Sequence, residues 1–192
     1  MIQIYCKNMD EIWFAAAIRN ERIIATTFAP NENNALKHLL KDLPYNVPFQ
    51  IAEKPTQFSK KVLSDLKSIF DGKNASSKFE LEMKHLSGYT QKVLRCVSSV
   101  PVGYVTTYSE VAKAMRGSPR AVGRVMATNP FSPLVPCHRV VRSDFTLGGF
   151  GGGIAMKWEI LQRENRGYSQ SMKIKVNGKS LSLFPINFLR KD

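Results

Sequence analysis

The chain has 192 residues, 43% of them hydrophobic, which allows one or two domains with a proper core and argues against wholesale disorder. No apolar run is long enough to span a bilayer, the N-terminus carries acids where a signal peptide has bases, and three widely spaced cysteines argue against a disulfide framework. We therefore expect an intracellular, cytoplasmic protein in a reducing compartment, with no membrane partner. Lys and Arg outnumber Asp and Glu by 28 to 15, which suits a polyanion such as nucleic acid but also a plain solvated basic surface.

The N-terminal half predicts a small antiparallel sheet with two helices. Apolar residues that alternate or cluster predict a three-stranded meander over residues 2–6, 12–18 and 22–28. Helical spacing of apolar positions then predicts helices over 33–42 and 57–72. Loops are expected at 43–50 and 73–78. A short strand over 79–83 precedes the domain boundary, which we place near 80–88.

The next part of the chain predicts short helices. Apolar positions at helical spacing predict a helix over 88–99, followed by an extended piece. A short helix over 109–117 ends in glycine, and Ser118 then caps a second helix over 119–129 with Pro119 at its first position. Two short helices around a glycine turn are typical of the helix-turn-helix motif and also of an ordinary helical hairpin in a core.

The remainder predicts a flexible GGFGGG loop, a helix and a hairpin. The helix spans 154–165, and its inward side is expected to be formed by Ile154, Trp158 and Leu161. In the tail, the alternating strands MKIKV and SLSLF flank Asn177-Gly178, which is the turn sequence favoured by a β-hairpin.

The segment VPCHRVV, residues 135–141, carries the most chemistry. Pro136 excludes a helix interior and the valines favour an extended, buried segment, so Cys137 is expected to lie in a core-like slot. A cysteine attacks as a thiolate, so a base must take its proton, and His138 is the adjacent candidate. Because side chains alternate along an extended segment, a bridging water or a local turn is needed between the two. Glu164 is the nearest downstream acceptor that could orient the histidine.

Four blocks in this region resemble the O6-alkylguanine-DNA alkyltransferases, the methylated-DNA–protein-cysteine methyltransferase family. In chain order, over roughly residues 88–165, they are TTYSEVAKAM, SPRAVGRVMATNP, PCHRVV and GGFGGGIAMKWEILQREN. The N-terminal region is similar to the family only loosely, as a variable α/β domain, and the tail after residue 166 lies outside the shared pattern. The resemblance implies DNA repair, in which an alkyl group moves irreversibly from guanine O6 to the protein's own cysteine, without a cofactor.

The resemblance also implies catalytic roles. Cys137 would accept the alkyl group, His138 would take the thiol proton through a water, and Glu164 would hold and polarise that histidine. Tyr108 would donate toward the purine ring and crowd the 3′ phosphate while the nucleotide rotates out. Asn129 would brace the helix-turn-helix against the active-site segment.

A second implied set contacts DNA and walls the pocket. Arg120 would fill the vacated space in the base stack, and the second helix would enter the minor groove, where the small residues Ala121 and Gly123 allow close backbone approach. Tyr108 shares this DNA-binding role. Arg124 stands where the family often has a small residue and would contact a phosphate or point to solvent. The implied pocket wall comprises Met126, Val140, Phe150, Gly151 and Lys157.

Three further departures from the family pattern concern the pocket loop. Gly151 stands where some members have a serine beside the alkylated oxygen, which leaves a backbone N–H for that contact. Phe150 replaces a common tyrosine and loses its hydroxyl. Phe145 stands where a turn glycine is usual, which puts the shape of the loop, and its tolerance for bulky alkyl groups, in question.

The sequence thus predicts three parts. Residues 1–85 form an α/β domain with a small antiparallel sheet, residues 86–168 a mostly α, winged-helix-like domain with the helix-turn-helix and the transfer site, and residues 169–192 a hairpin extension. The hairpin could brace the domain, bind DNA through its lysines or meet a partner. The expected partner is double-stranded DNA carrying O6-alkylguanine, bound by a monomer. No metal is expected, because the candidate zinc ligands lack a fourth member: Cys6, His38 and His85.

Two alternatives to the repair function stay open. One is an alkyltransferase-like protein that binds damaged bases without transfer, and the other is a helix-turn-helix regulator. The presence of Cys137 weighs against the first, and the regulator would leave the CHR segment unexplained.

Overall fold

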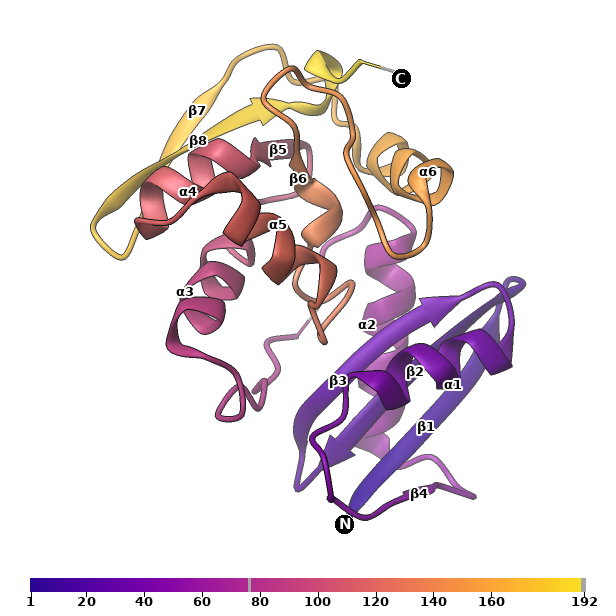
Figure 1. Cartoon of the computed structure of the whole chain (residues 1–192). Helices are drawn as coiled ribbons and strands as arrows, with labels where there is room; N and C mark the ends of the chain where they lie inside the picture. Colours follow the sequence, from indigo (N-terminus) through magenta and orange to yellow (C-terminus); the bar gives the residue numbers. More distant parts are fainter. Residues whose placement is uncertain (76, 191–192) are drawn as a thin grey trace. The chain divides into compact units, whose positions relative to one another are not determined.

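The structure is a computed structural model that describes residues 1–75 and 77–190 (Figure 1). Its contacts divide the chain into two compact units. The N-terminal unit comprises Met1–Phe70, Asn74–Leu86 and Pro130–Leu134, and the C-terminal unit comprises Asp71–Lys73, Ser87–Asn129 and Val135–Asp192. No helix in the described part of the chain is long and apolar enough to cross a membrane.

A four-stranded sheet forms the centre of the N-terminal unit. The predicted antiparallel meander is formed by β1 (Ile2–Met9), β2 (Ile12–Arg19) and β3 (Arg22–Ala29). A fourth strand, β4 (Phe49–Ile51), pairs in parallel with β1 and completes the order β3-β2-β1-β4. The sequence predicted a loop over 43–50. The end of that prediction is wrong because β4 has only three residues, all exposed, and therefore shows no alternation of apolar and polar positions.

Two helices cover opposite faces of this sheet (Figure 1): α1 (Glu32–Lys41) and α2 (Gln57–Phe70). Leu39 of α1 lies in an apolar cluster with Ala15 of β2. Phe70 of α2 packs edge-on against Phe14 of the same strand, with ring centroids 5.7 Å apart. Neighbouring residues of a strand point to opposite faces, so each helix seals one face of the sheet.

The strand predicted over 79–83 is reduced to one bridge in the structure. Leu81 bridges to Ile23 of β3 in parallel, held by backbone hydrogen bonds on either side. The pairing does not extend because Thr26, three residues further along β3, bridges instead to Phe131. The residues of a segment far along the chain thus occupy the edge that the short strand would need.

Three capped helices begin the C-terminal unit: α3 (Gly88–Val97), α4 (Tyr108–Met115) and α5 (Pro119–Ala127). The hydroxyl before each helix accepts a hydrogen bond from the backbone N–H three residues later; these caps are Ser87, Thr107 and Ser118. The Ser118 cap and Pro119 at the first position of α5 confirm the sequence prediction. α4 begins at Tyr108, one residue earlier than predicted, because Thr107 is the cap.

The turn between α4 and α5 is tight and packs against α3. Arg116 adopts a left-handed conformation with a φ of 54°, and Gly117 follows it. A Cβ atom at Gly117 would collide with the Tyr89 hydroxyl of α3. Only glycine fits here, because the backbone at position 117 lies against the Tyr89 side chain. This contact fixes the turn between α4 and α5 against α3.

A second sheet, with the order β6-β5-β8-β7, supports these helices. Its strands are β5 (Tyr104–Thr107), β6 (Val140–Val141), β7 (Met172–Val176) and β8 (Lys179–Pro185). β7 and β8 form the predicted hairpin around Asn177-Gly178, and β8 also pairs antiparallel with β5. The hairpin is thus part of the sheet that carries the residues around Cys137.

The last helix, α6 (Ile154–Glu164), buries a face that only partly matches the predicted one. Leu161 is fully buried and Trp158 packs against its apolar cluster, as predicted, but Ile154 is 49% exposed. The other buried positions are Lys157, Ile160 and Glu164. The prediction missed Lys157 and Glu164 because it counted only apolar residues, whereas these two are buried with hydrogen-bond partners.

Candidate functional site

Cys137 lies in a tight turn rather than in the extended segment that its sequence predicts. A 3-10 turn spans Cys137–Arg139, closed by the Arg139 N–H, which donates to the Pro136 carbonyl at 2.9 Å. Extended structure begins only at Val140, the start of β6. Pro136 has a ψ of 67°, which takes the chain out of the β region before the cysteine. The prediction was wrong here because flanking valines carry no signal for a turn at polar residues.

The turn has a direct consequence for Cys137 and His138. Successive side chains in a 3-10 turn are about 120° apart, so the two point in different directions. Cys137 is only 7% exposed and borders a cavity, whereas His138 is fully buried. The local turn is thus present, but it does not aim the two side chains at each other, so a proton would pass between them through a bridging water.

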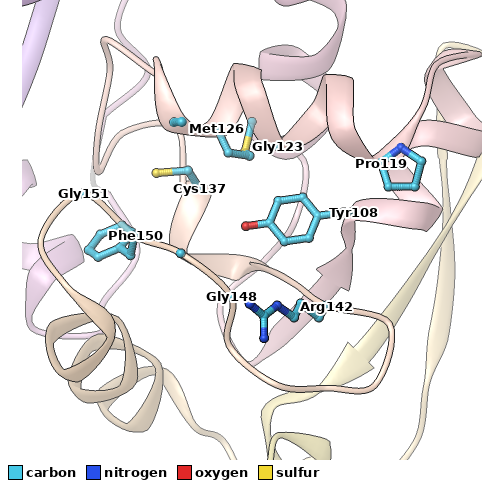
Figure 2. A pocket seen from close by; sticks show the side chains of 11 residues that line it. Tyr108, Pro119, Gly123, Met126, Cys137, Arg142, Gly148, Phe150 and Gly151 are labelled. Carbon is cyan, nitrogen blue, oxygen red and sulfur yellow. The ribbon is translucent and has the colours of Figure 1, made fainter. Parts of the chain in front are cut away.

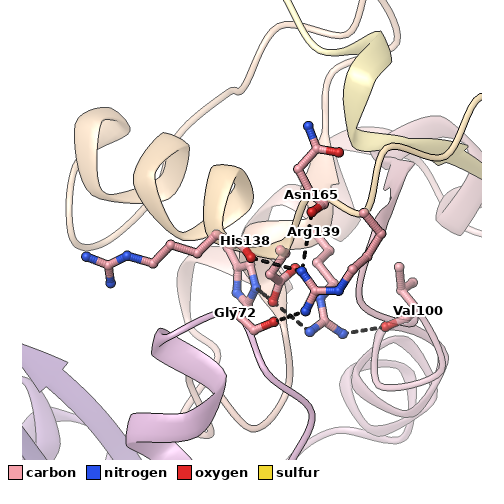
Figure 3. Close-up of polar contacts among 8 residues, drawn as sticks. Gly72, Val100, His138, Arg139 and Asn165 are labelled. Carbon is pink, nitrogen blue, oxygen red and sulfur yellow. Dashed lines mark hydrogen bonds and ion pairs between the residues drawn. The ribbon is translucent and has the colours of Figure 1, made fainter.

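His138 is held by a buried carboxylate from α6. Its Nε2 lies 3.0 Å from Oε1 of Glu164, and both side chains have no exposed surface (Figure 3). Burial would raise the pKa of Glu164, but His138 and Arg139 outweigh it and hold that pKa at about 2. Glu164 is therefore ionised, and an ionised carboxylate only accepts hydrogen bonds, so Nε2 carries the proton.

The other ring nitrogen of His138 is left for chemistry. Burial lowers the pKa of His138 despite the opposing pull of Glu164, so the ring is neutral near pH 7. Nδ1 is buried and has no hydrogen-bond partner within the described residues. A neutral ring with Nε2–H bonded to a carboxylate presents the lone pair of Nδ1, which is the form of a general base.

Arg139 completes this buried cluster. Its Nε and Nη2 donate to the two carboxylate oxygens of Glu164 at 2.8 and 2.7 Å, and Nη1 donates to the Val100 carbonyl at 2.6 Å (Figure 3). A bidentate arginine fixes the carboxylate plane as well as its charge. The predicted site residues do not include Arg139, and its adjacency to His138 is the signal that could have placed it here.

The cavity beside Cys137 has a volume of about 570 Å³. Four of the predicted residues line it together with Cys137 and Tyr108, namely Gly123, Met126, Phe150 and Gly151. In Figure 2 the Tyr108 hydroxyl points toward the Cys137 sulfur across the same space. Gly148 and Gly149, of the glycine loop expected to wall the pocket, also line the cavity. Pro119, Ala127 and Arg142 line it as well and were not predicted. Such a volume accommodates a small planar ligand.

Two predicted wall residues, Val140 and Lys157, are fully buried and do not line the cavity. Lys157 acts from behind the wall: its Nζ donates to the carbonyls of Val140 and Leu147 at 2.8 and 2.6 Å, and to that of Gly149 at 3.4 Å. The ammonium group thus joins β6 to the start of the glycine loop. Lys157, which the resemblance places in the pocket wall, instead holds the backbone next to the cavity in position through these hydrogen bonds.

Tyr108 enters the cavity from the first turn of α4. Burial, together with the nearby Cys137, raises the pKa of its hydroxyl. The hydroxyl therefore stays protonated near neutral pH and is able to donate a hydrogen bond to a ligand in the cavity.

Asn129 connects α5 to the segment before the cysteine. Its side-chain Nδ2 donates to the Val135 carbonyl at 2.9 Å, and the residue is 8% exposed. The contact lies where the resemblance placed a brace.

The other predicted α5 residues lie on open surface. Arg120 and Arg124 are exposed and four residues apart, so they share one face of the helix. Ala121 and Gly123 are half-buried, and a Cβ on Gly123 would meet nothing within 4 Å, which leaves open space above this part of the helix. The accessible surface of α5 therefore combines cationic and small residues.

Phe145 keeps the turn that a glycine would make. It has a φ of 65°, in the left-handed region, and its N–H donates to the Arg142 carbonyl at 3.0 Å. Its ring packs edge-on against Phe184 and Phe188, with centroids 5.1 and 6.0 Å away. Aromatic packing against the tail offsets the cost of the left-handed backbone, so the loop is tied to the C-terminal segment.

The Cys137 thiol borders a cavity whose wall includes part of α5. The next residue, His138, is buried, neutral and held by a carboxylate. These features are those of a protein that uses a cysteine nucleophile on a ligand bound in the cavity. Residues 88–166 match the family model described as the 6-O-methylguanine DNA methyltransferase, DNA binding domain. A methylated-DNA–protein-cysteine methyltransferase of Thermococcus kodakarensis is 37% identical over 161 residues, which cover 81% of this chain and 90% of the relative. The chain belongs to this methylated-DNA–protein-cysteine methyltransferase family.

Two further similarities agree with this. A methyltransferase of the same name from Methanothermobacter thermautotrophicus is 40% identical over 113 residues. That match covers 57% of this chain and 63% of the relative, slightly under two thirds of its length. The crystal structure of an O6-methylguanine-DNA methyltransferase from Pyrococcus kodakaraensis strain KOD1 superimposes with a TM-score of 0.65 and 30% identity, covering 85% of this chain and 99% of that one.

Proposed function

We propose that this protein repairs DNA by moving an alkyl group from O6 of guanine to Sγ of its own Cys137, once per molecule. The observation that carries the proposal is the pairing of a shielded thiol at a cavity wall with a buried histidine whose Nδ1 is unoccupied within the described residues. The other two cysteines are poor candidates, because burial raises the pKa of the Cys6 and Cys96 thiols to about 11. Those thiols stay protonated and inert.

The proposed transfer is one displacement. The Cys137 thiol gives its proton through a water to Nδ1 of His138, and Glu164 stabilises the imidazolium that results. The sulfur then bonds to the alkyl carbon as the bond from that carbon to guanine O6 breaks. The electron pair goes to the base, where a hydrogen bond from the Tyr108 hydroxyl stabilises the charge. The base takes up a proton from solvent and leaves as unmodified guanine, and the His138 imidazolium returns its proton to solvent. The thioether product has no thiol to regenerate.

The substrate must reach the thiol as an extruded base. O6 of guanine lies inside the duplex, and flipping a nucleotide costs a few kcal/mol of unstacking. In the proposed complex the winged-helix-like C-terminal unit places α5 in the minor groove, where open space around Gly123 permits close approach. Arg120 inserts into the vacated position of the stack, and Arg124 contacts a phosphate. Minor-groove binding discriminates sequence poorly, which suits a repair protein.

We further propose that the protein works as a monomer on double-stranded DNA carrying O6-alkylguanine. Residues 86–168 would hold the DNA-binding and transfer functions, with residues 1–85 as a distinct N-terminal domain and the hairpin of 169–192 as an extension that shares the sheet of the transfer domain. In this scheme the glycine loop from Gly148 to Gly151 forms a wall of the pocket that receives the flipped base.

The test is direct labelling of the protein by its substrate. The protein is incubated with a duplex containing one O6-methylguanine and digested, and the peptide holding Cys137 is weighed. One added methyl group on that peptide is expected, and none on the peptide holding Cys96. An unmodified Cys137 peptide from folded protein would contradict the proposal, and DNA binding without labelling would indicate a damage-binding protein instead.

Two variants sharpen the result. Cys137→Ala should keep DNA binding and lose transfer, whereas Arg120→Ala should weaken both. Cys96→Ala is the matched control, since it removes a buried thiol that does not line the cavity and should leave transfer unchanged.

A further inference from the structure

The C-terminal hairpin has an exposed basic face. Lys173 and Lys175 are two residues apart in β7, so they point to the same side, opposite the small residues Ser182 and Ser180 of β8. The other side carries the apolar residues Ile174 and Leu181, the second of which is fully buried. One face of the hairpin thus packs on the unit, and the lysine face is left to solvent.

These cations have no acidic neighbours in sequence and no ion-pair partners in space. Residues 169–190 contain no Asp or Glu, and the same is true of residues 111–143, which include α5. Lys173 and Lys175 share this face, whereas Lys179 is the cross-strand partner of Val176 beside the turn and lies on the other side of the hairpin at its tip. All three lysines are exposed, and none forms an ion pair within the described part of the chain. Glu110 of α4 reaches the hairpin through a hydrogen bond with Ser182, but its charge is paired with Lys113. The exposed lysines therefore leave a net positive surface, which favours an anionic partner.

The tip of the hairpin lies at the same end of the unit as the turn that leads into α5. β8 lies along α4 (Figure 1). Thr106, just before that helix, donates to the Ser182 carbonyl. From Ser182 to Lys179 the strand advances about 10 Å. From Glu110 to Met115, α4 advances about 7.5 Å alongside it. Lys179 and the turn that leads into α5 therefore lie at the same end of the unit.

We propose that this hairpin is a second phosphate-binding surface, which holds the backbone of the DNA duplex whose minor groove receives α5. The inference rests on the proposed function, since it assumes that DNA binds at α5. Lysine is a compact point charge that suits phosphates and reads no sequence, which matches a protein that must bind any sequence. The hairpin lies outside the part of the chain matched by the family model, so this surface would be an addition of this chain to the shared domain.

The experiment compares two triple variants with the same change in charge. Lys173→Gln, Lys175→Gln and Lys179→Gln are combined in one protein. The control combines Lys37→Gln, Lys60→Gln and Lys61→Gln, which are exposed helix positions of the N-terminal unit. Affinity for a short undamaged duplex is measured by fluorescence anisotropy at several salt concentrations. Transfer from free O6-benzylguanine, which needs no duplex, is measured in parallel.

The hairpin variant should bind the duplex about 10-fold more weakly, and the slope of log affinity against log salt should fall by about 2 to 3, close to one unit for each lost phosphate contact. The control variant should keep most of the affinity and slope, and both should react with free O6-benzylguanine at the parent rate. Parent-like affinity and slope in the hairpin variant, or an equal loss in the control, would overturn the inference alone. A parent protein that neither binds duplex DNA nor labels Cys137 would overturn the proposed function and this inference together.

Discussion

Lys157 donates its ammonium group to the carbonyl oxygen of Leu147 at 2.6 Å, from a position on α6 with no exposed surface. The same group donates to the Val140 carbonyl at 2.8 Å, so one buried cation joins the strand after the Cys-His-Arg turn to the loop that borders the cavity. Burying a charge is costly unless it is well hydrogen-bonded. Lys157 therefore links the backbone of the pocket wall to the strand that follows the Cys-His-Arg turn, although it does not itself line the cavity.

Replacing this lysine should loosen the pocket wall. Lys157→Met keeps most of the aliphatic stem but leaves backbone carbonyls without a donor, so we expect a loss of about 1–3 kcal/mol in the free energy of unfolding. Hydrogen exchange of the loop from residue 147 to 151 should accelerate more than that of α3. Lys113→Met, at an exposed position of α4, is the control and should change stability little. Unchanged exchange in the loop of Lys157→Met would contradict the bracing role.

The carboxylate behind His138 should control the rate of transfer. Glu164→Gln removes the charge that keeps the proton on Nε2, and the amide can donate to Nε2, which would move the proton to Nδ1 and abolish the base. We expect methyl transfer to slow by about 100-fold or more, with DNA affinity unchanged. Glu159→Gln changes an exposed carboxylate of the same helix, paired with Arg163, and should react at the parent rate. Similar rates in the two variants would show that Glu164 has no part in the reaction.

The sequence predicts most elements here but not the inner face of α6. Ser118-Pro119 and Asn177-Gly178 are local signals, since a cap, a fixed φ and a two-residue turn act within a few residues, and the structure has all of them where predicted. Glu164 and Lys157 depend on partners 17 to 25 residues away, such as Val140 and Arg139, so no local pattern shows that a charge is buried. Glu164 is singled out because His138 needs an acceptor and because of the family resemblance, not because of periodicity.

Acid should destabilise the protein in two steps. The pKa of His138 is lowered from 6.5 by burial, so as the pH falls below 6.5 the unfolded chain takes up this proton before the folded one does. The free energy of unfolding then falls, by at most about 1.4 kcal/mol per pH unit for one proton. The pKa of Glu164 is about 2 against a usual 4.5, because His138 and Arg139 outweigh its burial, so a second loss follows as the pH falls from 4.5 toward 2.

The first step is measured by denaturant unfolding between about pH 5 and about pH 8. His138→Gln should show a flatter dependence on pH than the parent, because the proton uptake of one group is removed. Burial raises the pKa of Asp42 to about 6, which acts in the opposite direction in this range, so the difference between variants is the informative quantity. His85→Gln is the comparison variant, because His85 is a second histidine and burial lowers its pKa as well. Equal pH dependence in the parent and His138→Gln would contradict a neutral buried ring.

The left-handed backbone at Phe145 predicts an unusual order of stabilities. Phe145→Ala loses the packing on Phe184 and Phe188 and keeps the strained φ of 65°, whereas Phe145→Gly loses the same packing but relieves the strain. The glycine variant should therefore be the more stable of the two by about 1 kcal/mol, the reverse of the order at most positions. Phe188→Ala removes one aromatic partner without changing that backbone and should fall between the parent and the alanine variant. Thermal unfolding of the four proteins checks the order, and an alanine variant at least as stable as the glycine one would show that the turn relaxes when the ring is removed.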